Sequence, residues 1–487
     1  MMMKADSVMK DVVSSVQNAY QSAGFSPVGS LKELDHLLSA PGGKLCLGME
    51  CLDRDLWDYP RAAEQIGCLG FHRARLQTGW QKTEQTPGVY DFAWLDEIVD
   101  GLLKTGVKPF LSLSYGNRLY CSNPEEMPDL ANGGLGHFPV ITPEERAAWC
   151  AYVKATVEHF RDRIDEYEIW NEPDILVFCR VPMAWPDAYM EMVRMTAPVI
   201  RAAMPEATVI TCTAGFENLQ PLYERGLLDW CDVHSFHGYL FFPEMRSVDY
   251  YVNFLSPIRR RYPNVRFWRG EAGCPSYNNP ISKGALSNIP VTEIKQAKFA
   301  MRHLLMDLKN DCISCTSYFH AYDFEHFTHK LRYHYGVIRH EDLSRKPAYH
   351  CLQVFSHLFD GDTVHRTQDN LTYGFREEGT LAQEQRPAVQ FASFERKGVP
   401  FYTYHLPQYI TDDFCVKTLP LSVPQGIRTP VVVDPVSREV YVPEDGLYPI
   451  TDYPLILMDA QAAEEFAVLA VQQAKTQEED LQQRYEE

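Results

Sequence analysis

Short apolar runs alternate with amphipathic stretches between residues 44 and 360. The apolar runs have the length and composition of buried β-strands, and the stretches between them carry apolar residues at helical spacing. This alternation is typical of parallel βα units. Eight apolar runs can be counted, at residues 44–50, 70–77, 107–117, 166–172, 207–215, 232–239, 266–273 and 312–322. Eight strands close a parallel barrel, so we predict an α/β fold, a (β/α)8 or TIM barrel, over residues 44–360.

Several of the intervening stretches carry helix signals of their own. Residues 142–145 form a capping box with proline at the first helical position, because Thr142 and Glu145 can each bind a free backbone N–H. Apolar residues follow at helical spacing, namely Trp149, Val153, Val157 and Phe160. A similar helix is expected after Thr292 and a last one over residues 347–359, after which Gly361 marks the end of the barrel.

The chain outside the barrel divides into three parts. Residues 1–43 predict a helical lead-in, helical to about Ala40. Residues 361–458 predict a β-sandwich accessory domain, to which N-terminal strands could contribute, because turn residues break β-like segments at 388–395, 400–405, 429–433 and 438–442. Residues 459–487 are rich in Ala, Gln and Glu and predict a charged helical tail.

The net charge and the cysteine content indicate which partners and which cellular compartment to expect. Lys and Arg number 46 against 65 Asp and Glu, and the formal charge of −19 disfavours nucleic acid and anionic membranes as partners. Residues 1–25 contain no apolar stretch of the length of a signal peptide or membrane helix. The 13 cysteines are odd in number and irregularly spaced, which favours reduced thiols. We therefore expect a cytoplasmic protein, and the single close pair Cys312 and Cys315 does not predict a zinc site.

Two glutamates follow strands of the predicted barrel at the end where active sites form. The fourth run ends in Trp170-Asn171-Glu172-Pro173, and the seventh ends in Arg269-Gly270-Glu271-Ala272-Gly273. The glycines of the seventh run are expected to leave room for a ligand close to the backbone. Glu172 and Glu271 should then face each other across the barrel mouth.

Paired carboxylates are the groups that glycosidic cleavage requires, since one attacks the anomeric carbon while the other protonates the departing oxygen. The two must differ in protonation. Arg269 lies two residues before Glu271, on the same face of a regular strand, and we expect its charge to keep Glu271 ionised as the nucleophile. Glu172, facing that negative charge in a partly dry pocket, should stay protonated until it donates.

These residues resemble those of clan A glycoside hydrolases, with Asn-Glu-Pro on strand four and a glutamate on strand seven. Within the clan the chain is most similar to glycoside hydrolase family 39, which holds β-xylosidases and α-L-iduronidases. The segment Gly79-Trp80-Gln81-Lys82-Thr83-Glu84, followed by Pro87-Gly88-Val89-Tyr90-Asp91-Phe92 and Leu95-Asp96, is similar to that family's segment after strand two. The resemblance covers residues 44–361.

The resemblance implies roles for individual side chains. Glu172 would be the acid/base, Glu271 the nucleophile, and Asn171 would bind the 2-hydroxyl of the sugar. His237 and Tyr239 match a strand-six His-x-Tyr whose tyrosine hydrogen-bonds the nucleophile, and Arg75 matches an arginine that supports the same carboxylate. Arg75 could instead be a structural arginine paired with a neighbouring carboxylate. Phe319 stands where clan members usually place a tryptophan as the floor for the sugar, which leaves the identity of the sugar open.

Other candidates rest on position alone. Glu50 and Asn117 end strands one and three, and each could face the pocket or serve as a structural hydrogen-bonder. Trp80, Trp57 and Trp94 could stack on sugars or belong to the core. Asp323, His326 and Tyr333, in the loop after strand eight, could bind sugar hydroxyls. The histidines of that loop lack the spacing of a metal site.

The sequence therefore predicts a retaining exo-glycosidase that needs neither metal nor organic cofactor and acts on a small carbohydrate. Long loops at residues 118–141, 274–290 and 324–346 are expected to wall a pocket. A transglycosylase of the same fold and a non-catalytic carbohydrate-binding relative are the alternatives. Xylose, arabinose, glucose, galactose and a uronic acid all stay open as the sugar. The tail after Asp459 could pack against a second copy, so a homo-oligomer is possible.

Overall fold

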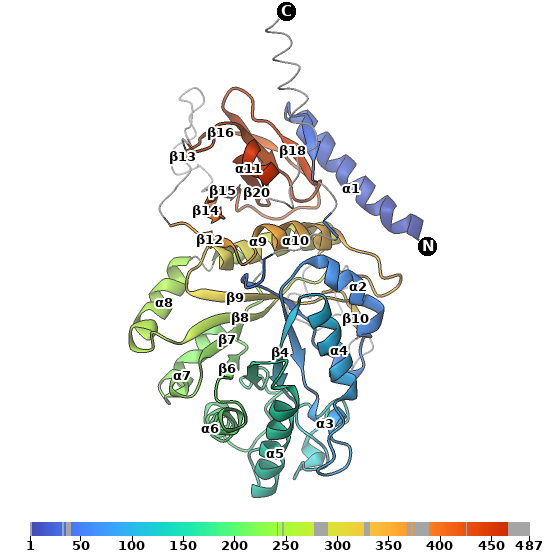
Figure 1. The fold of residues 1–487 in the computed structure, drawn as a ribbon, viewed down its shortest axis with the longest axis vertical. Coiled ribbons are helices and arrows are strands. Elements are labelled where there is room, and N and C mark those ends of the chain that lie inside the picture. The colour runs from blue at the N-terminus through green and yellow to red at the C-terminus, as the bar shows by residue number, and fades with distance from the viewer. Residues whose placement is uncertain are drawn as a thin grey trace, which may run out of the picture.

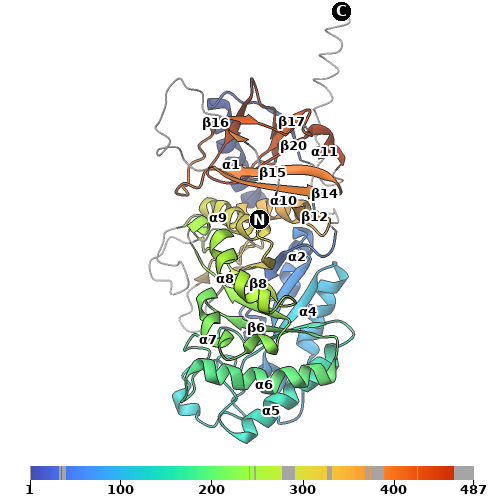
Figure 2. The ribbon, with the colours of Figure 1, turned by 90° about the vertical axis from the view of Figure 1, so that its left-hand side faces the viewer.

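The computed structural model describes residues 2–31, 34–35, 40–240, 242–245, 248–276, 291–325, 332–367, 372–373, 389–424 and 426–465. A barrel forms the lower body of this part of the chain and an antiparallel β domain the upper body (Figure 1). Helices α9 (Glu293–Leu308) and α10 (Pro347–Leu358) lie between the two bodies. The view turned by 90° shows the same stacking (Figure 2).

The barrel is closed and parallel. Its strands follow chain order: β2 (Leu45–Gly48), β3 (Arg73–Gln77), β4 (Lys108–Leu113), β5 (Glu166–Ile169), β6 (Thr208–Thr213), β7 (Val233–His237), β8 (Arg266–Ala272) and β9 (Ile313–Tyr318). Pairing of Leu45 with Thr316 joins the last strand to the first. Each strand lies inside one of the eight predicted runs, so the predicted TIM barrel is confirmed.

Helices connect successive barrel strands. They are α2 (Tyr59–Leu69), α3 (Trp80–Thr83), α4 (Ala93–Lys104), α5 (Pro143–Phe160), α6 (Trp185–Ala203), α7 (Leu219–Tyr223), α8 (Val248–Arg261), and α9 and α10 already named. Short 3-10 helices are η1 (Leu52–Arg54), η2 (Pro124–Glu126), η3 (Phe216–Asn218), η4 (Leu227–Asp229) and η5 (Pro243–Met245). The predicted capping box is present at α5, where the Thr142 side chain accepts from the Glu145 N–H and Glu145 accepts from the Thr142 N–H. Among the described residues, none of the helices combines the length and the apolar character needed to cross a bilayer.

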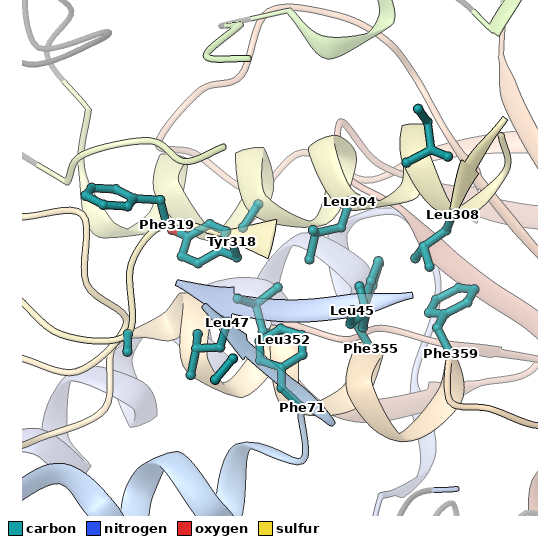
Figure 3. Close-up of a cluster of buried hydrophobic side chains, with 14 of the residues drawn as sticks. Leu45, Leu47, Phe71, Leu304, Leu308, Tyr318, Phe319, Leu352, Phe355 and Phe359 are labelled. Atoms are coloured by element: carbon teal, nitrogen blue, oxygen red, sulfur yellow. The ribbon is translucent and has the colours of Figure 1, made fainter. Parts of the chain in front are cut away.

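Side chains of β2 alternate between two environments, as expected for a strand buried on both faces. Leu45 and Leu47 belong to the main buried cluster together with Leu304 of α9 and Leu352 of α10 (Figure 3). Cys46 points the other way, into the barrel. It joins a separate apolar cluster built from six barrel strands, with members Cys46, Phe110, Ile210, Val233, Trp268 and Cys315. This cluster forms an apolar floor inside the barrel.

Small residues stand two positions further along the same six strands. They are Gly48, Ser112, Cys212, Ser235, Gly270 and Ser317. Because side chains two apart share one face of a strand, these residues lie above the apolar floor and leave space in the middle of the barrel. The fully buried side chain of Arg75 is among the largest in the molecule and fills part of that space.

The C-terminal domain is made of antiparallel sheets. One has seven strands in the order β1 (Pro27–Ser30), β18 (Glu439–Tyr441), β17 (Pro430–Val433), β20 (Leu455–Asp459), β15 (Val399–His405), β14 (Gln390–Arg396) and β12 (Thr363–His365). The other has three, β13 (Thr372–Tyr373), β16 (Lys417–Ser422) and β19 (Leu447–Ile450). A hairpin of β10 (Phe324–Glu325) and β11 (Arg332–Tyr333) follows the last barrel strand. An antiparallel sheet domain after the barrel is therefore confirmed.

The N-terminal segment is shorter as a helix than its sequence predicts. Helix α1 (Met2–Ser22) ends well before Ala40, and the strand β1 that follows pairs with β18. The Tyr20 ring stacks on Tyr441 at 3.7 Å between centroids, which holds α1 against the β domain. Beyond Asp459 the described chain continues as α11 (Ala460–Glu465), and the predicted tail at 466–487 lies outside the described residues.

Helix α9 is buried on every side, although its apolar residues predict only one buried face. Lys298 and Arg302 point at the β domain, where Lys298 Nζ lies 2.9 Å from Asp452 and Arg302 donates to the Gln408 carbonyl. A buried charge must be paired to be tolerated. These pairs therefore tie the barrel to the domain above it.

We predict that Lys298→Met destabilises the protein by about 3–5 kcal/mol, because it leaves the buried Asp452 carboxylate without its cation. Lys295→Met, one turn earlier on α9, is the matched control, since its partner Asp412 is 46% exposed. That control should cost about 1 kcal/mol or less. Urea denaturation of the two variants measures the difference. Equal stability of both variants would contradict the structural role given to the Lys298–Asp452 pair.

Candidate active site

Side chains from several strand ends meet at the carboxyl end of the barrel. Glu172 follows β5, His237 ends β7, and Glu271 lies near the end of β8. One carboxylate oxygen of Glu172, one of Glu271 and one ring nitrogen of His237 all lie within 4.8 Å of one another. The two predicted glutamates are thus neighbours, with His237 beside both.

The chain leaves β5 through an uncommon backbone conformation. Trp170 and Glu172 have φ angles of 68° and 46°, in the left-handed region that non-glycine residues rarely adopt. The surroundings hold this turn in place: the Trp170 N–H donates to the Leu113 carbonyl and its indole N–H donates to the Phe178 carbonyl. Strain of this kind, of order 1–3 kcal/mol per residue, gathers at functional sites.

A β-bulge in β8 separates the directions of Arg269 and Glu271. Phe236 pairs with Arg269, but the next residue of β7, His237, pairs with Glu271, so Gly270 is an extra residue in β8. A Cβ on Gly270 would come 2.1 Å from Ser235 Oγ, and only glycine allows this approach. The glycine therefore makes room for a neighbouring strand and not for a ligand, contrary to the sequence-based expectation.

Trp268 points into the apolar floor, so Arg269 faces away from the barrel interior, and the bulge after it turns Glu271 back toward the interior. Its guanidinium donates to both carboxylate oxygens of Asp307 on α9, at 2.6 and 2.8 Å, and to the Tyr251 hydroxyl at 2.7 Å. The prediction that Arg269 keeps Glu271 ionised is therefore wrong. It assumed a regular strand, in which residues two apart share a face.

Arg75 is the cation that touches Glu271. It lies at 0% exposure and donates to Glu271 Oε2 at 3.2 Å, to Glu50 Oε1 at 2.9 Å and to Glu168 Oε2 at 2.6 Å. Arg75 also donates to Asn171 Oδ1 at 2.8 Å. Arg75 thus meets both sequence-based interpretations, because it pairs with structural carboxylates and also contacts the predicted nucleophile.

His237 and Tyr239 contact the two glutamates directly. His237 Nδ1 lies 2.7 Å from Glu172 Oε1 and 3.4 Å from Glu271 Oε2. The Tyr239 hydroxyl donates to Glu271 Oε1. Behind this segment, the Gly238 carbonyl lies 3.1 Å from His303 Nε2 of α9, which holds the His237–Tyr239 turn from outside the barrel.

Burial and the neighbouring positive charges shift the pKa of Glu271 in opposite directions. Burial raises the pKa of Glu271 to about 7, and the nearby carboxylates of Glu172 and Glu50 also raise it. The charges of His237 and Arg75 oppose this rise without cancelling it. For His237 itself, burial works against the charged ring, but the charges of Glu271 and Glu172 and the hydrogen bond to Cys212 raise its pKa well above the usual value.

The spacing of two residue groups would admit a metal ion. One is Glu172, His237 and Glu271, and the other is Glu168, Cys212 and His237, each with ligand atoms within 4.8 Å of one another. Arg75 contacts Glu168 and Glu271, however, so a metal ion at either place would lie beside a buried guanidinium and be repelled by it. We therefore assign neither group to a metal.

Of three remaining candidate residues, one belongs to the active site and two have structural roles. Glu50 belongs to the site through Arg75, as described. Trp80 is 0% exposed, and its indole N–H donates to Glu84, so the idea that it stacks on a sugar is wrong. Asn117 donates to the Glu84 carbonyl at 2.7 Å and is also fully buried, which makes it the structural hydrogen-bonder of the two alternatives.

The loop after strand eight is anchored by its own side chains. Asp323 is buried and binds Lys346 Nζ at 2.8 Å and the Gly336 N–H at 2.9 Å, so its carboxylate serves the loop and not a sugar hydroxyl. Phe319 lies with its ring centroid 6.2 Å from that of Tyr239, beside the site. His326 and most of the predicted wall at 274–290 fall on residues outside the described part of the chain.

Two residues of the site were missed in the sequence. Glu168 is fully buried below Glu172 and shares Arg75 with Glu271, and Cys212 Sγ lies 3.4 Å from His237 Nε2. A charged residue inside an otherwise apolar strand, Tyr167-Glu168-Ile169, was the available signal for Glu168. One cysteine among 13 gave no signal for Cys212.

Comparison with known proteins places this geometry in a family. The profile of glycosyl hydrolases family 39 matches residues 61–396. A β-xylosidase from Geobacillus stearothermophilus is 23% identical over 328 residues, which cover 60% of this chain and 61% of that protein. This chain thus spans about three fifths of the length of that relative.

Solved structures share the fold. A family 39 glycoside hydrolase from Bacteroides cellulosilyticus WH2 matches with a TM-score of 0.63 at 19% identity, over 86% of this chain and 81% of that one. A family 39 β-xylosidase from Caulobacter crescentus matches with a TM-score of 0.53 at 16% identity, over 89% of this chain and 98% of that one. Because the family profile matches more than half of its residues, the chain belongs to glycoside hydrolase family 39.

Proposed function

We propose that this enzyme hydrolyses the terminal glycosidic bond of a small oligosaccharide or glycoside with retention of configuration. One observation carries the proposal: a carboxylate oxygen of Glu172 and one of Glu271 lie within 4.8 Å of each other. Retaining enzymes hold their two carboxyl groups about 5–5.5 Å apart, whereas inverting enzymes leave about 6.5–9.5 Å for a water molecule. The shorter separation favours direct attack by one carboxylate.

In the proposed reaction Glu271 attacks the anomeric carbon while Glu172 gives its proton to the departing glycosidic oxygen. The sugar is then esterified to Glu271, and Glu172 has become a carboxylate. Glu172 next takes a proton from water, whose oxygen attacks the anomeric carbon and releases Glu271. Glu172 regains its proton, so the cycle closes without any cofactor.

The neighbours of Glu271 suit the role of nucleophile. Tyr239 and Arg75 each hold a different oxygen of Glu271, which orients the carboxylate for attack. Arg75 also donates to Asn171 Oδ1, so the side-chain NH2 group of Asn171 is left to donate a hydrogen bond to a sugar 2-hydroxyl. Hydrogen bonds to the 2-hydroxyl strengthen in the transition state of this reaction class.

We infer a neutral sugar as the substrate. Among the described residues around the mouth, three cations are already paired: Arg75 with three carboxylates, Arg54 with Asp53 and Lys346 with Asp323. Within this described part, a sugar carboxylate would meet the carboxylates of Glu50, Glu168 and Glu271 and compete with them for Arg75. Likeness to β-xylosidases supports a pentose, released one unit at a time from the chain end.

A reducing compartment such as the cytoplasm is consistent with the chemistry of the chain. All 13 cysteines are free thiols, and most of them are buried. We propose a small carbohydrate as the main partner, because the charge of −19 would repel nucleic acid and anionic lipid surfaces.

Hydrolysis of an aryl β-xyloside should release xylose that is first seen as the β-anomer, because two displacements at one carbon restore its configuration. Proton NMR during turnover measures the anomer before mutarotation. Glu271→Gln is the inactive control, and an aryl glucuronide tests the inferred neutral sugar. Initial release of the α-anomer would contradict retention, and faster cleavage of the glucuronide would contradict the inferred substrate.

The pH dependence of kcat/KM should show an acidic limb near pH 7. The reason is that burial raises the pKa of Glu271 to about 7, and attack requires its ionised form, so activity is lost as the pH falls through this value. Circular dichroism at each pH controls for unfolding. An acidic limb near 4, the ordinary range of a carboxyl group, would show that the site does not raise the pKa of its nucleophile.

A further inference from the structure

A buried thiol lies behind the active-site histidine. Cys212 belongs to β6, is 0% exposed and points into the barrel, in the layer of small residues above the apolar floor. Its Sγ lies 3.4 Å from His237 Nε2, within hydrogen-bond reach, and 3.8 Å from the Thr213 carbonyl oxygen. His237 therefore has the thiol on one ring nitrogen and Glu172 on the other.

The surroundings of His237 are strongly negative. On the Nδ1 side are Glu172 at 2.7 Å and Glu271 at 3.4 Å. Cys212 lies on the Nε2 side. A carboxylate oxygen of Glu168 lies within 4.8 Å of the Cys212 sulfur and of a ring nitrogen of His237. The other charged or titratable groups that act on this place are Glu50 and Arg75 across the barrel, Tyr239 on Glu271, and His234 on the same strand.

The directions of the hydrogen bonds follow from these neighbours. Nδ1 faces one oxygen of Glu172 and one of Glu271. The ionised Glu271 accepts hydrogen bonds, and the protonated Glu172 accepts through its carbonyl oxygen, so a hydrogen on Nδ1 satisfies both neighbours. If Nε2 also carries one, the ring is charged and Nε2–H needs a buried acceptor. The sulfur of Cys212 is placed to accept it, while the S–H of Cys212 donates to the Thr213 carbonyl.

We propose that Cys212 is a positioning residue for this reaction: its sulfur accepts the Nε2–H of His237 and so holds the ring as an imidazolium whose Nδ1–H bonds Glu172. This proposal rests on the proposed function, because it concerns how the same two glutamates are controlled. It gives a buried cysteine a defined part in the charge balance of the site.

The electrostatic environment supports this arrangement. The pKa of His237 is raised well above its usual value although burial opposes the charged ring, because Glu271 and Glu172 attract the charge and the hydrogen bond to Cys212 favours the charged form. Burial raises the pKa of the Cys212 thiol, so sulfur keeps its hydrogen and acts as a neutral acceptor. A buried N–H of a charged group without an acceptor would be costly.

The charge on His237 matters for Glu271. It is foremost among the influences that lower the pKa of Glu271 against burial. Loss of the acceptor at Nε2 would favour the neutral ring, and Glu271 would then lose that opposing charge. The protonated form of Glu271 would persist to higher pH, where it cannot attack.

The test compares Cys212→Ala, Cys212→Ser and the control Cys46→Ala in the full-length enzyme. Cys46 is a buried thiol of β2 in the apolar floor, away from the glutamates. Cys212→Ala should move the acidic limb of kcat/KM upward by about one pH unit. Cys212→Ser, which keeps an acceptor, should move it by less, and Cys46→Ala should leave it in place. An unmoved limb in an active Cys212→Ala enzyme would overturn the proposal, because a merely structural thiol would alter stability alone.

A second measurement does not depend on turnover. In protein labelled with 15N-histidine, the His237 ring nitrogens should show the charged form at neutral pH in the wild type and the neutral Nδ1–H form in Cys212→Ala. His237→Gln identifies the resonances. A neutral ring in the wild type would refute the proposal even if the enzyme cleaves glycosides as expected. A charged ring in a protein inactive on all glycosides would instead refute the proposed function alone.

Discussion

The buried guanidinium of Arg75 is the interaction on which the rest of the site depends. A charge at 0% exposure is stable only when it is paired and fully hydrogen-bonded, and Arg75 reaches Glu50, Glu168 and Glu271, which come from the ends of different barrel strands. The space for it exists because the strands carry small residues above the apolar floor. Arg75 therefore links three features: the register of the strands, the packing of the barrel interior and the position of the proposed nucleophile.

The second body of the molecule supports the site from outside. Helix α9 presents Asp307 to Arg269 and His303 to the Gly238 carbonyl, and so holds β8 and the turn that carries His237 and Tyr239. The same helix is covered by the β domain through Lys298 and Arg302. The accessory domain thus stabilises the helix that backs the active site, although it contributes none of the described residues of the glutamate cluster.

The barrel and both glutamates could be predicted from the sequence because each depends on local patterns: apolar runs of strand length, and polar residues where those runs end. The separation of Arg269 from Glu271 could not, since the bulge at Gly270 depends on contact with Ser235 of the neighbouring strand β7. Trp80 is buried against Trp149 and Tyr152 of α5, Asn117 binds the Glu84 carbonyl, and the part played by Glu168 depends on Arg75 of β3. Such contacts join residues distant in sequence, and periodicity along one segment carries no information about them.

In the proposed reaction Glu271 forms a covalent bond to the sugar while Glu172 supplies and recovers the proton. The most direct test is to trap the intermediate with an activated 2-deoxy-2-fluoro xyloside and to locate the label by mass spectrometry of the digested protein. We expect one sugar per chain, attached to the peptide at Glu271, and no label in Glu271→Gln. Label on any other residue would contradict it.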